Sequence, residues 1–384
     1  MPEHNLKPYR NFCVKNNSLK LLLFTVMILF FGKVANAAEV IVRIDNPPES
    51  GTVALALFNT ANSFADLRDP VRVVKHSLDG SEEYKIDNVE AGEYALLVYF
   101  DENANDRIDK NFIGIPKEPL GFSNRYLPKG PPSYKRARFQ IQQGESRTFD
   151  VELYRPLGKY GRIGMGVGVI ARSSPYRDYD GTVSQVIPAI TYNGERLQIY
   201  GPRIQFGLVG SGKLRLAATG EYRIGPYDED DSDYLEGMGD RSDTFMGGLA
   251  IQAVLPAGFG LTGRYQHDLL GRVGGGEARI VLDKTLQFGI VRISPEIALT
   301  WASADISNHD YGVPDDKATA ARPAYTLGDT YSTEIGLGMF IEITRDWLFI
   351  MNVASESLSD EVTASPIVSE DYVIKGFAAI NYVF

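Results

Sequence analysis

Residues 331–344, with the sequence YSTEIGLGMFIEIT, show most clearly how this chain folds. Tyr331, Ile335, Leu337 and other mostly apolar residues occupy the odd positions, whereas the even positions carry mainly polar or small residues such as Glu334 and Gly336. Because successive side chains of a β-strand point to opposite faces, this segment has one apolar face and one polar face. Strands of soluble proteins are typically about five or six residues long. A longer strand with this alternation is typical of a transmembrane β-barrel.

Two further segments repeat the pattern. Residues 213–224 (KLRLAATGEYRI) are apolar at even positions, and residues 291–301 (VRISPEIALTW) are apolar mainly at odd positions. After the first 38 residues, no apolar segment is long enough for a transmembrane helix. Since only helices and closed barrels satisfy their backbone in lipid, the sequence predicts an antiparallel barrel with an apolar outer face and a polar lumen.

Turns and loops alternate in length along this region. Asn193-Gly194 and Arg345-Asp346 predict tight links. Longer polar loops are expected at residues 173–182, 226–243, 308–329 and 360–371. Short turns on the periplasmic side and long loops outside the cell are the usual asymmetry of outer-membrane barrels.

The number of strands depends on one register change. A first count gives eleven, but an even number is expected because the preceding domain and the C-terminus should both be periplasmic. Leu197 and Ile199 are apolar at odd positions, whereas Ile204 and Phe206 are apolar at even ones. Either Gly201-Pro202 forms a turn, or a β-bulge flips the faces. We predict the turn and therefore about 12 strands, with 10 as the fallback.

Residues 1–37 are predicted to be a secretory signal peptide. A positive region with Lys7 and Arg10 precedes an apolar run at residues 21–31, and Ala35-Asn36-Ala37 supplies small residues for cleavage after Ala37. The single cysteine, Cys13, lies in this leader, so the mature chain is expected to have no disulfide and no thiolate metal ligand. Its acidic balance excludes nucleic acid as a partner, since the whole chain already has a formal net charge of −10.

Residues 38–153 predict a separate periplasmic β-sandwich. Short β-rich runs occur at residues 40–44, 53–58, 84–89, 94–100, 138–141 and 147–153, and no helical period of useful length appears. Residues 154–159 (YRPLGK) contain Pro and Gly and are expected to link this domain to the barrel at residues 160–384.

Oxygen-bearing side chains recur at alternate positions in the first domain, as in a calcium-binding loop: Asp101, Asn103, Asn105 and Asp109, with Glu118 farther along. Asp106 and Phe112 stand where an EF-hand requires Gly and Glu, and the flanks read as strands. Two interpretations stay open, a Ca²⁺ site that stabilises the N-terminal domain or a solvated turn rich in Asp and Asn.

Charged residues on the predicted lumen face suit either an open pore or a closed barrel in which they pair: Arg215, Glu221, Arg223, Arg264, Asp268, Glu334 and Glu342. Three histidines remain after the leader, His76, His267 and His309, and no nucleophile motif accompanies them. We therefore predict no catalytic residues, no cofactor beyond Ca²⁺, and a protein that is not an enzyme.

Loop motifs of the second region resemble the MipA/OmpV family of outer-membrane barrels. They occur at residues 176–179 (YRDY), 188–192 (PAITY), 230–244 (DDSDYLEGMGDRSDT), 311–313 (YGV), 323–325 (PAY) and 365–368 (SPIV). The resemblance implies an outer-membrane barrel without catalytic residues. In part of the family it implies an adaptor between a murein lytic transglycosylase and a murein synthase, and other members are treated as surface antigens or adhesins.

Residues 52–126 resemble an exported domain of unknown function, through residues 101–106 (DENAND), 111–119 (NFIGIPKEP) and 121–124 (GFSN). The combined prediction is an envelope scaffold or adaptor embedded in outer-membrane lipid, with its N-terminal domain in the periplasm. The alternatives are a small-solute channel or a surface adhesin, and a lipid- or murein-modifying enzyme is the most distant alternative.

Overall fold

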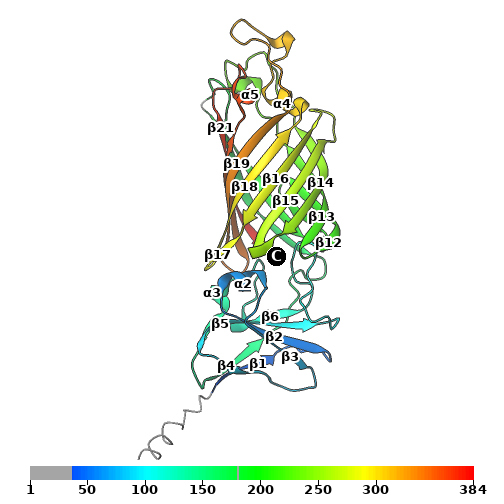
Figure 1. The fold of residues 1–384 in the computed structure, drawn as a ribbon, viewed down its shortest axis with the longest axis vertical. Coiled ribbons are helices and arrows are strands. Elements are labelled where there is room, and N and C mark those ends of the chain that lie inside the picture. The colour runs from blue at the N-terminus through cyan, green and yellow to red at the C-terminus, as the bar shows by residue number, and fades with distance from the viewer. Residues whose placement is uncertain (1–36, 180) are drawn as a thin grey trace, which may run out of the picture.

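The computed structural model describes residues 37–179 and 181–384, and Figure 1 shows a small β-domain at one end of a long barrel. The predicted signal peptide, apart from its last residue, and Cys13 lie outside the described residues. In the described part of the chain, no helix has the length and apolar character needed to cross a membrane.

Two β-sheets form the N-terminal domain. The first consists of β1 (Ala38–Ile44), β4 (Tyr84–Val89) and β8 (Ser146–Val151), and β1 runs parallel to β8. The second consists of β2 (Thr52–Phe58), β3 (Arg72–Ser77), β5 (Gly92–Asp101), β6 (Leu120–Phe122) and β7 (Arg138–Ile141). The predicted all-β sandwich is confirmed.

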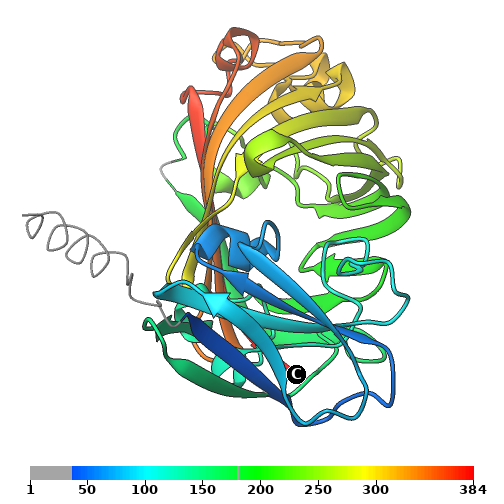
Figure 2. The same ribbon diagram turned by 60° about the horizontal axis from the view of Figure 1, so that its bottom comes forward.

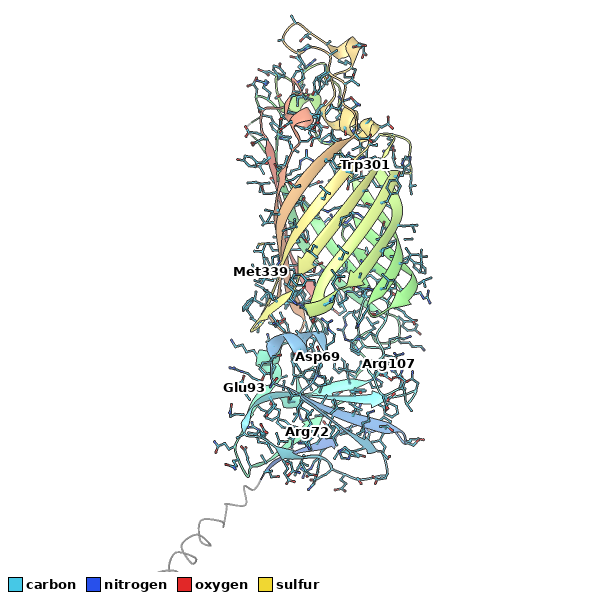
Figure 3. The ribbon with its side chains drawn as sticks, in the orientation of Figure 1. Asp69, Arg72, Glu93, Arg107, Trp301 and Met339 are labelled. Atoms are coloured by element: carbon cyan, nitrogen blue, oxygen red, sulfur yellow. The ribbon has the colours of Figure 1, made fainter. Side chains whose placement is uncertain are left out.

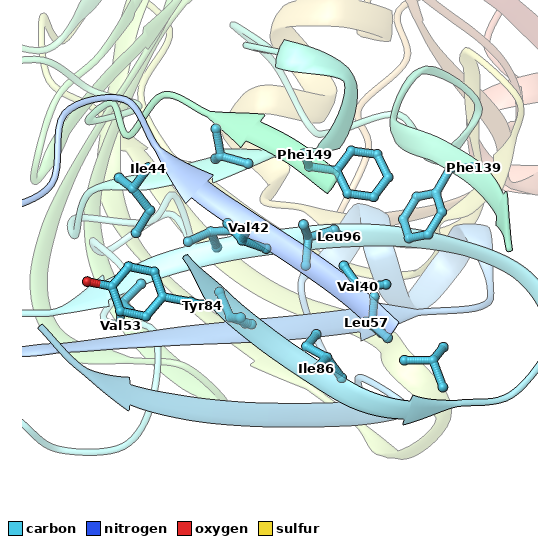
Figure 4. Close-up of a cluster of buried hydrophobic side chains, with 14 of the residues drawn as sticks. Val40, Val42, Ile44, Val53, Leu57, Tyr84, Ile86, Leu96, Phe139 and Phe149 are labelled. Carbon is cyan, nitrogen blue, oxygen red and sulfur yellow. The ribbon is translucent and has the colours of Figure 1, made fainter. Parts of the chain in front are cut away.

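The core of this domain lies between the two sheets (Figure 4). Val40 and Val42 of β1 meet Leu55 of β2 and Leu96 of β5, and all four are buried. Burial of each such side chain contributes about 1.5–3 kcal/mol. The short β-rich runs at residues 40–44, 53–58 and 94–100 therefore identified strands that build this core.

A second apolar cluster covers the other face of the larger sheet. Here α2 (Ala61–Asp66) and α3 (Tyr134–Ala137) contribute Phe64 and Tyr134, and the Phe64 ring packs edge-on against both Tyr134 and Phe122. The sequence shows no helical period of useful length here because these helices are six and four residues long, too short for a hydrophobic period. The edge strand β3 and the three-residue β6 were also missed, since neither carries a long alternating pattern.

The rest of the chain forms a closed antiparallel barrel. Its strands are β9 (Arg162–Ser173), β10 (Thr182–Asn193), β11 (Leu197–Tyr200), β12 (Arg203–Ser211), β13 (Leu214–Arg223), β14 (Thr244–Val254), β15 (Phe259–Asp268), β16 (Gly276–Lys284), β17 (Leu286–Phe288), β18 (Val291–Ala302), β19 (Thr330–Glu342), β20 (Trp347–Ser357) and β21 (Tyr372–Val383). β16 and β17 both pair with β18 as one interrupted strand, and β21 pairs with β9 to close the barrel. The prediction of 12 strands is confirmed.

The register change that decided this count is a turn. Tyr200 pairs with Arg203 and Ile199 pairs with Ile204, so β11 and β12 form a hairpin. Gly201 adopts a φ of +53° at its tip, a conformation that glycine reaches without steric cost. The β-bulge interpretation of this site was wrong.

The two ends of the barrel differ. All four predicted long loops lie at one end, where they include α4 (Ala304–Tyr311) and α5 (Asp360–Thr363). Figure 3 shows Trp301 toward this end and Met339 nearer the N-terminal domain. The short turns lie at the end where the N-terminal domain is docked, and in outer-membrane barrels that end faces the periplasm.

Candidate functional site

The five predicted calcium ligands lie together in the segment between β5 and β6. Asp101 accepts hydrogen bonds from the backbone N–H groups of Asn105 and Asp106, and Asn103 and Asn105 donate to the Asp109 carboxylate. Glu118 accepts from the N–H groups of Glu102 and Asp109, and burial raises the pKa of its carboxyl.

These contacts match the alternative interpretation, an Asp- and Asn-rich turn held by its own side chains. Between residues 37 and 384, Asp180 apart, no group of three or more His, Cys, Asp and Glu side chains is arranged to hold a metal ion. The calcium site at Asp101, Asn103, Asn105, Asp109 and Glu118 therefore stays a prediction.

Charged side chains inside the barrel form ion-pair chains across neighbouring strands. Glu221 lies between Arg203 and Arg264, with N–O distances of 2.8 Å to each. On the opposite part of the wall, Glu334 contacts Arg279 at 2.5 Å and Lys375 at 3.3 Å. Because each charge has an opposite neighbour, these chains neutralise the charge along the lumen wall.

All seven predicted lumen charges have polar partners. Arg223 pairs with Asp310 at 2.5 Å, and Asp268 accepts bonds from Thr244 and from the N–H groups of the loop after β15. Arg215 and Glu342 bind groups of the N-terminal domain. Four of the seven, Glu221, Arg223, Arg264 and Glu334, are therefore held in ion pairs within the barrel.

The N-terminal domain docks onto the periplasmic rim of the barrel (Figure 2). The hydroxyl of Tyr126 donates to the Glu342 carboxylate at 2.5 Å, and Glu342 is almost completely buried. Arg136 adds hydrogen bonds to the carbonyls of Glu342 and Ile343. Burial, followed by the charge of Glu342, raises the pKa of Tyr126 well above its usual range, so the phenol stays a donor.

A second anchor is formed by the loop that carries Phe112. The Phe112 ring lies so close to Gly207 of β12 that a Cβ added there would come within 2.3 Å of it. Arg215 covers the same ring and donates to the Phe112 carbonyl at 3.0 Å. Asn111 donates to the Gly194 carbonyl at 2.8 Å, so the loop is fixed to both a strand and a turn of the barrel.

Further polar contacts extend the docking around the rim. Asp66 of α2 pairs with Arg292 at 2.7 Å, and Lys129 pairs with Asp346 at 2.8 Å while donating to the carbonyl of Val383. An open pocket of about 450 Å³ remains at this seam, lined by Asn124, Arg125, Tyr126, Leu127, Arg136, Glu342 and Arg345. The interface thus involves residues from nearly the whole circumference of the barrel.

The opposite end is covered by the long loops. Their apolar side chains form one buried cluster that contains Tyr176, Tyr227, Leu235, Met238, Val313, Leu327, Val362, Ile367 and Val368. The hydroxyl of Tyr176 donates to the carbonyl of Asp310 at 3.1 Å, which connects the loop after β9 to α4. We call this cluster the extracellular lid.

An ion-pair network lies beneath the lid. Burial alone would raise the pKa of Asp310, but Arg223 and His309 lower it to about 2. His309 donates through Nδ1 to the Asp310 carboxylate at 2.9 Å. Ser307 bonds instead to the Ser303 carbonyl and to Thr330, so no serine–histidine–aspartate arrangement forms among these residues.

Sequence reasoning missed the docking residues Asp66, Phe112, Tyr126, Lys129 and Arg136. Each is an ordinary residue in its local context, and its partner lies more than 80 residues away in the chain. Glu342 is the exception among the docking residues. The sequence predicts a charged residue on the lumen face here, close to the tight turn at Arg345-Asp346, although it does not predict the contact with the N-terminal domain.

Barrel closure, the apolar outer face and the polar lumen define a β-barrel protein of the outer membrane. More than half of the chain, residues 165–384, matches the family described as MltA-interacting protein MipA, and the chain belongs to that family. Residues 42–149 match a family described as an uncharacterized protein conserved in bacteria.

Named relatives agree with this assignment. The chain is 28% identical to the MltA-interacting protein of Escherichia coli over 234 residues, which covers 59% of this chain and 91% of that protein. It is also 28% identical to the outer membrane protein Omp26La of Vibrio anguillarum over 206 residues, covering 53% and 79% of the two chains. Among solved structures, the NanC porin aligns with a TM-score of 0.31 at 10% identity, covering 57% of this chain and 98% of that one.

Proposed function

We propose that this protein is a non-enzymatic scaffold of the outer membrane, in which the barrel holds a periplasmic domain in one fixed orientation. The docking of that domain by Tyr126, Phe112 and Lys129 onto the rim carries the proposal. A domain attached by a flexible linker would instead sample many orientations. Fixed orientation suits a platform on which other envelope proteins assemble.

The partner we propose is a murein lytic transglycosylase, with a murein synthase as a second partner. The name of the Escherichia coli relative, MltA-interacting protein, supports the first of these. Figure 3 shows Arg72, the first residue of β3, toward the end of the domain away from the barrel. Val71 and Val73 beside it are 50% and 43% exposed, so this edge offers an apolar contact to a periplasmic partner.

The alternative of a small-solute channel has less support. Glu221 and Glu334 are held in ion pairs inside the lumen, the N-terminal domain covers one end, and the extracellular lid covers the other. Conduction would require at least one of these covers to move.

The scaffold is tested by binding of the mature protein, in detergent, to a purified lytic transglycosylase of the MltA type. We expect saturable binding that Val73→Asp weakens at least tenfold. The control is Asp316→Ala, an exposed substitution at the extracellular end, which should leave the affinity unchanged. Failure of the unmodified protein to bind, or equal loss in both variants, contradicts the proposal.

We also propose that Ca²⁺ stabilises the N-terminal domain through Asp101, Asn103, Asn105, Asp109 and Glu118. The carboxylates of Asp109 and Glu118 accept hydrogen bonds within this loop, and a cation would replace those amide and N–H donors. Millimolar Ca²⁺ should raise the melting temperature of the domain, and Asp109→Asn should reduce that rise. A melting temperature that changes with neither Ca²⁺ nor a chelator contradicts the proposed Ca²⁺ site.

A further inference from the structure

The barrel wall is incomplete between β10 and β13 in the half that carries the long loops. β10 pairs with β9 along its full length, but it pairs with β11 only through residues 191–193. β12 begins at Arg203, opposite Glu221 of β13. Beyond the Gly201-Pro202 turn, β10 and β13 therefore have neither β11 nor β12 between them. At the level of that turn the two strands stand three spacings apart, about 14 Å.

The edge of β10 along this gap consists of unpaired backbone groups. The carbonyl of Ile190 accepts a hydrogen bond from the Gly201 N–H at 3.0 Å across the hairpin, so every second residue beyond it also directs its backbone toward the gap. These residues are Thr182, Ser184, Val186 and Pro188. Within the described residues, no hydrogen bond reaches their gap-facing groups.

The gap lies at the depth of the membrane. On the outer face of β10, Val186 is 70% exposed and Ile190 is also exposed, and the adjacent β9 presents Val167 and Val169 in the same band. Toward the loops, Thr182 and Ser184 place polar side chains at the expected level of the lipid headgroups. An unsatisfied backbone group in lipid is strongly destabilising, so this edge requires a partner that brings polar groups to the hydrocarbon boundary.

Pro188 argues against a protein strand as that partner. A strand added to this edge would form a ladder with the N–H groups of the gap-facing residues, and Pro188 has no N–H to donate. Proline on an edge is one of the ways in which proteins prevent strand addition. The edge therefore offers more acceptors than donors, since all four residues have carbonyls and only three have N–H groups.

The lumen is polar and accessible directly behind the gap. Arg203, at the hairpin tip, has 65% of its side chain exposed, against 21% for Arg264 and 17% for Arg279 elsewhere in the lumen. On the inner side, Arg172 of β9 donates to the carbonyl of Pro226, beyond β13, at 2.9 Å. One arginine thus connects the two sides of the opening on its inner side.

We propose that this gap is a lateral opening occupied by lipopolysaccharide of the outer leaflet. Its acyl chains lie against Val186 and Ile204 on the outer face, and the polar atoms at the base of its headgroup bond the gap-facing backbone of β10. Lipopolysaccharide fits because its acyl chains carry amide N–H and hydroxyl groups, which donate to the free carbonyls. The ester groups of a glycerophospholipid only accept hydrogen bonds.

A photo-crosslinking amino acid placed inside the barrel tests this proposal in intact cells. Gln185 faces the lumen beside the gap, because it alternates with the outward Val186. Thr262 of β15 is the matched control, since it faces the lumen where both neighbouring strands are paired. We expect at least tenfold more lipopolysaccharide adduct at position 185 than at position 262, and equal yields overturn the proposal.

Other products at position 185 are equally decisive. Adducts mainly with phospholipid would overturn the assignment to lipopolysaccharide, and adducts with a second copy of the chain would mean that a strand fills the gap. Heat-dependent gel mobility shows whether each variant has folded. If the variant at Gln185 does not fold, Ile187, on the same lumen face of β10, takes its place with the same expected ratio.

Discussion

The two ends of the barrel are closed by different physical means. At the periplasmic end a folded domain is held by directional polar contacts, such as Tyr126 with Glu342 and Asp66 with Arg292. At the extracellular end, loops without a sheet of their own are held by a buried apolar cluster around Tyr176 and Leu235. Polar contacts fix one orientation of a partner surface, whereas apolar burial is non-directional and mainly excludes water. The periplasmic end is therefore built for positioning and the extracellular end for sealing.

Glu342→Ala should have the largest effect on this comparison. It removes the acceptor of the buried Tyr126 hydroxyl and the partner of Arg136, and the loss of one member of such a buried set costs about 3–5 kcal/mol. Hydrogen–deuterium exchange should become faster in the docking segment around Tyr126 and remain unchanged in the lid. If the docking segment is equally protected from exchange in the unmodified protein and in Glu342→Ala, the polar contacts do not fix the domain.

Leu235→Ala probes the opposite end. Leu235 is completely buried in the lid, so its truncation should cost about 2–5 kcal/mol of loop order. Limited proteolysis should then cut between β13 and β14 while the N-terminal domain stays protected. The control is Asp316→Ala in the exposed 3-10 turn, and identical cleavage of both variants contradicts an apolar seal.

Acid should loosen the lid before the docked domain. The pKa of Asp310 is about 2 in the folded protein and near 4 when unfolded, so its contribution of about 2 kcal/mol is complete above pH 4. That contribution is lost as the pH falls toward 2. Tyrosine fluorescence or proteolysis of the lid should show this transition, and Asp310→Asn should remove it. A transition that is unchanged in this variant contradicts the role of Arg223 and Asp310.

Gly207→Ala should give the most local of these effects. The new Cβ would come within 2.3 Å of the Phe112 ring, and such overpacking typically costs about 1–3 kcal/mol. Hydrogen–deuterium exchange should become faster in the loop around Asn111 and Phe112. Gly338→Ala is the matched control, because a Cβ there meets only Ser294 and Asn352 at ordinary distances, and it should leave exchange unchanged.

Sequence alone predicted the parts that depend on periodicity. The alternation at residues 213–224 and 331–344 identified barrel strands, and the register change around Gly201-Pro202 gave the strand number. It could not predict that Arg223 would find Asp310, or that Phe112 would fit against Gly207. Those contacts join residues far apart in the chain, and they depend on barrel closure and on the orientation of the docked domain. No local sequence pattern determines the closure or the orientation.

The most direct test of a barrel closed at both ends is single-channel conductance of the refolded mature protein in a planar bilayer. Heat-dependent gel mobility would show in parallel that the protein has folded and inserted. We predict a silent barrel, because the docked domain, the paired lumen charges and the extracellular lid leave no continuous aqueous path. Steady current steps that scale with salt concentration would contradict this account and would favour a channel.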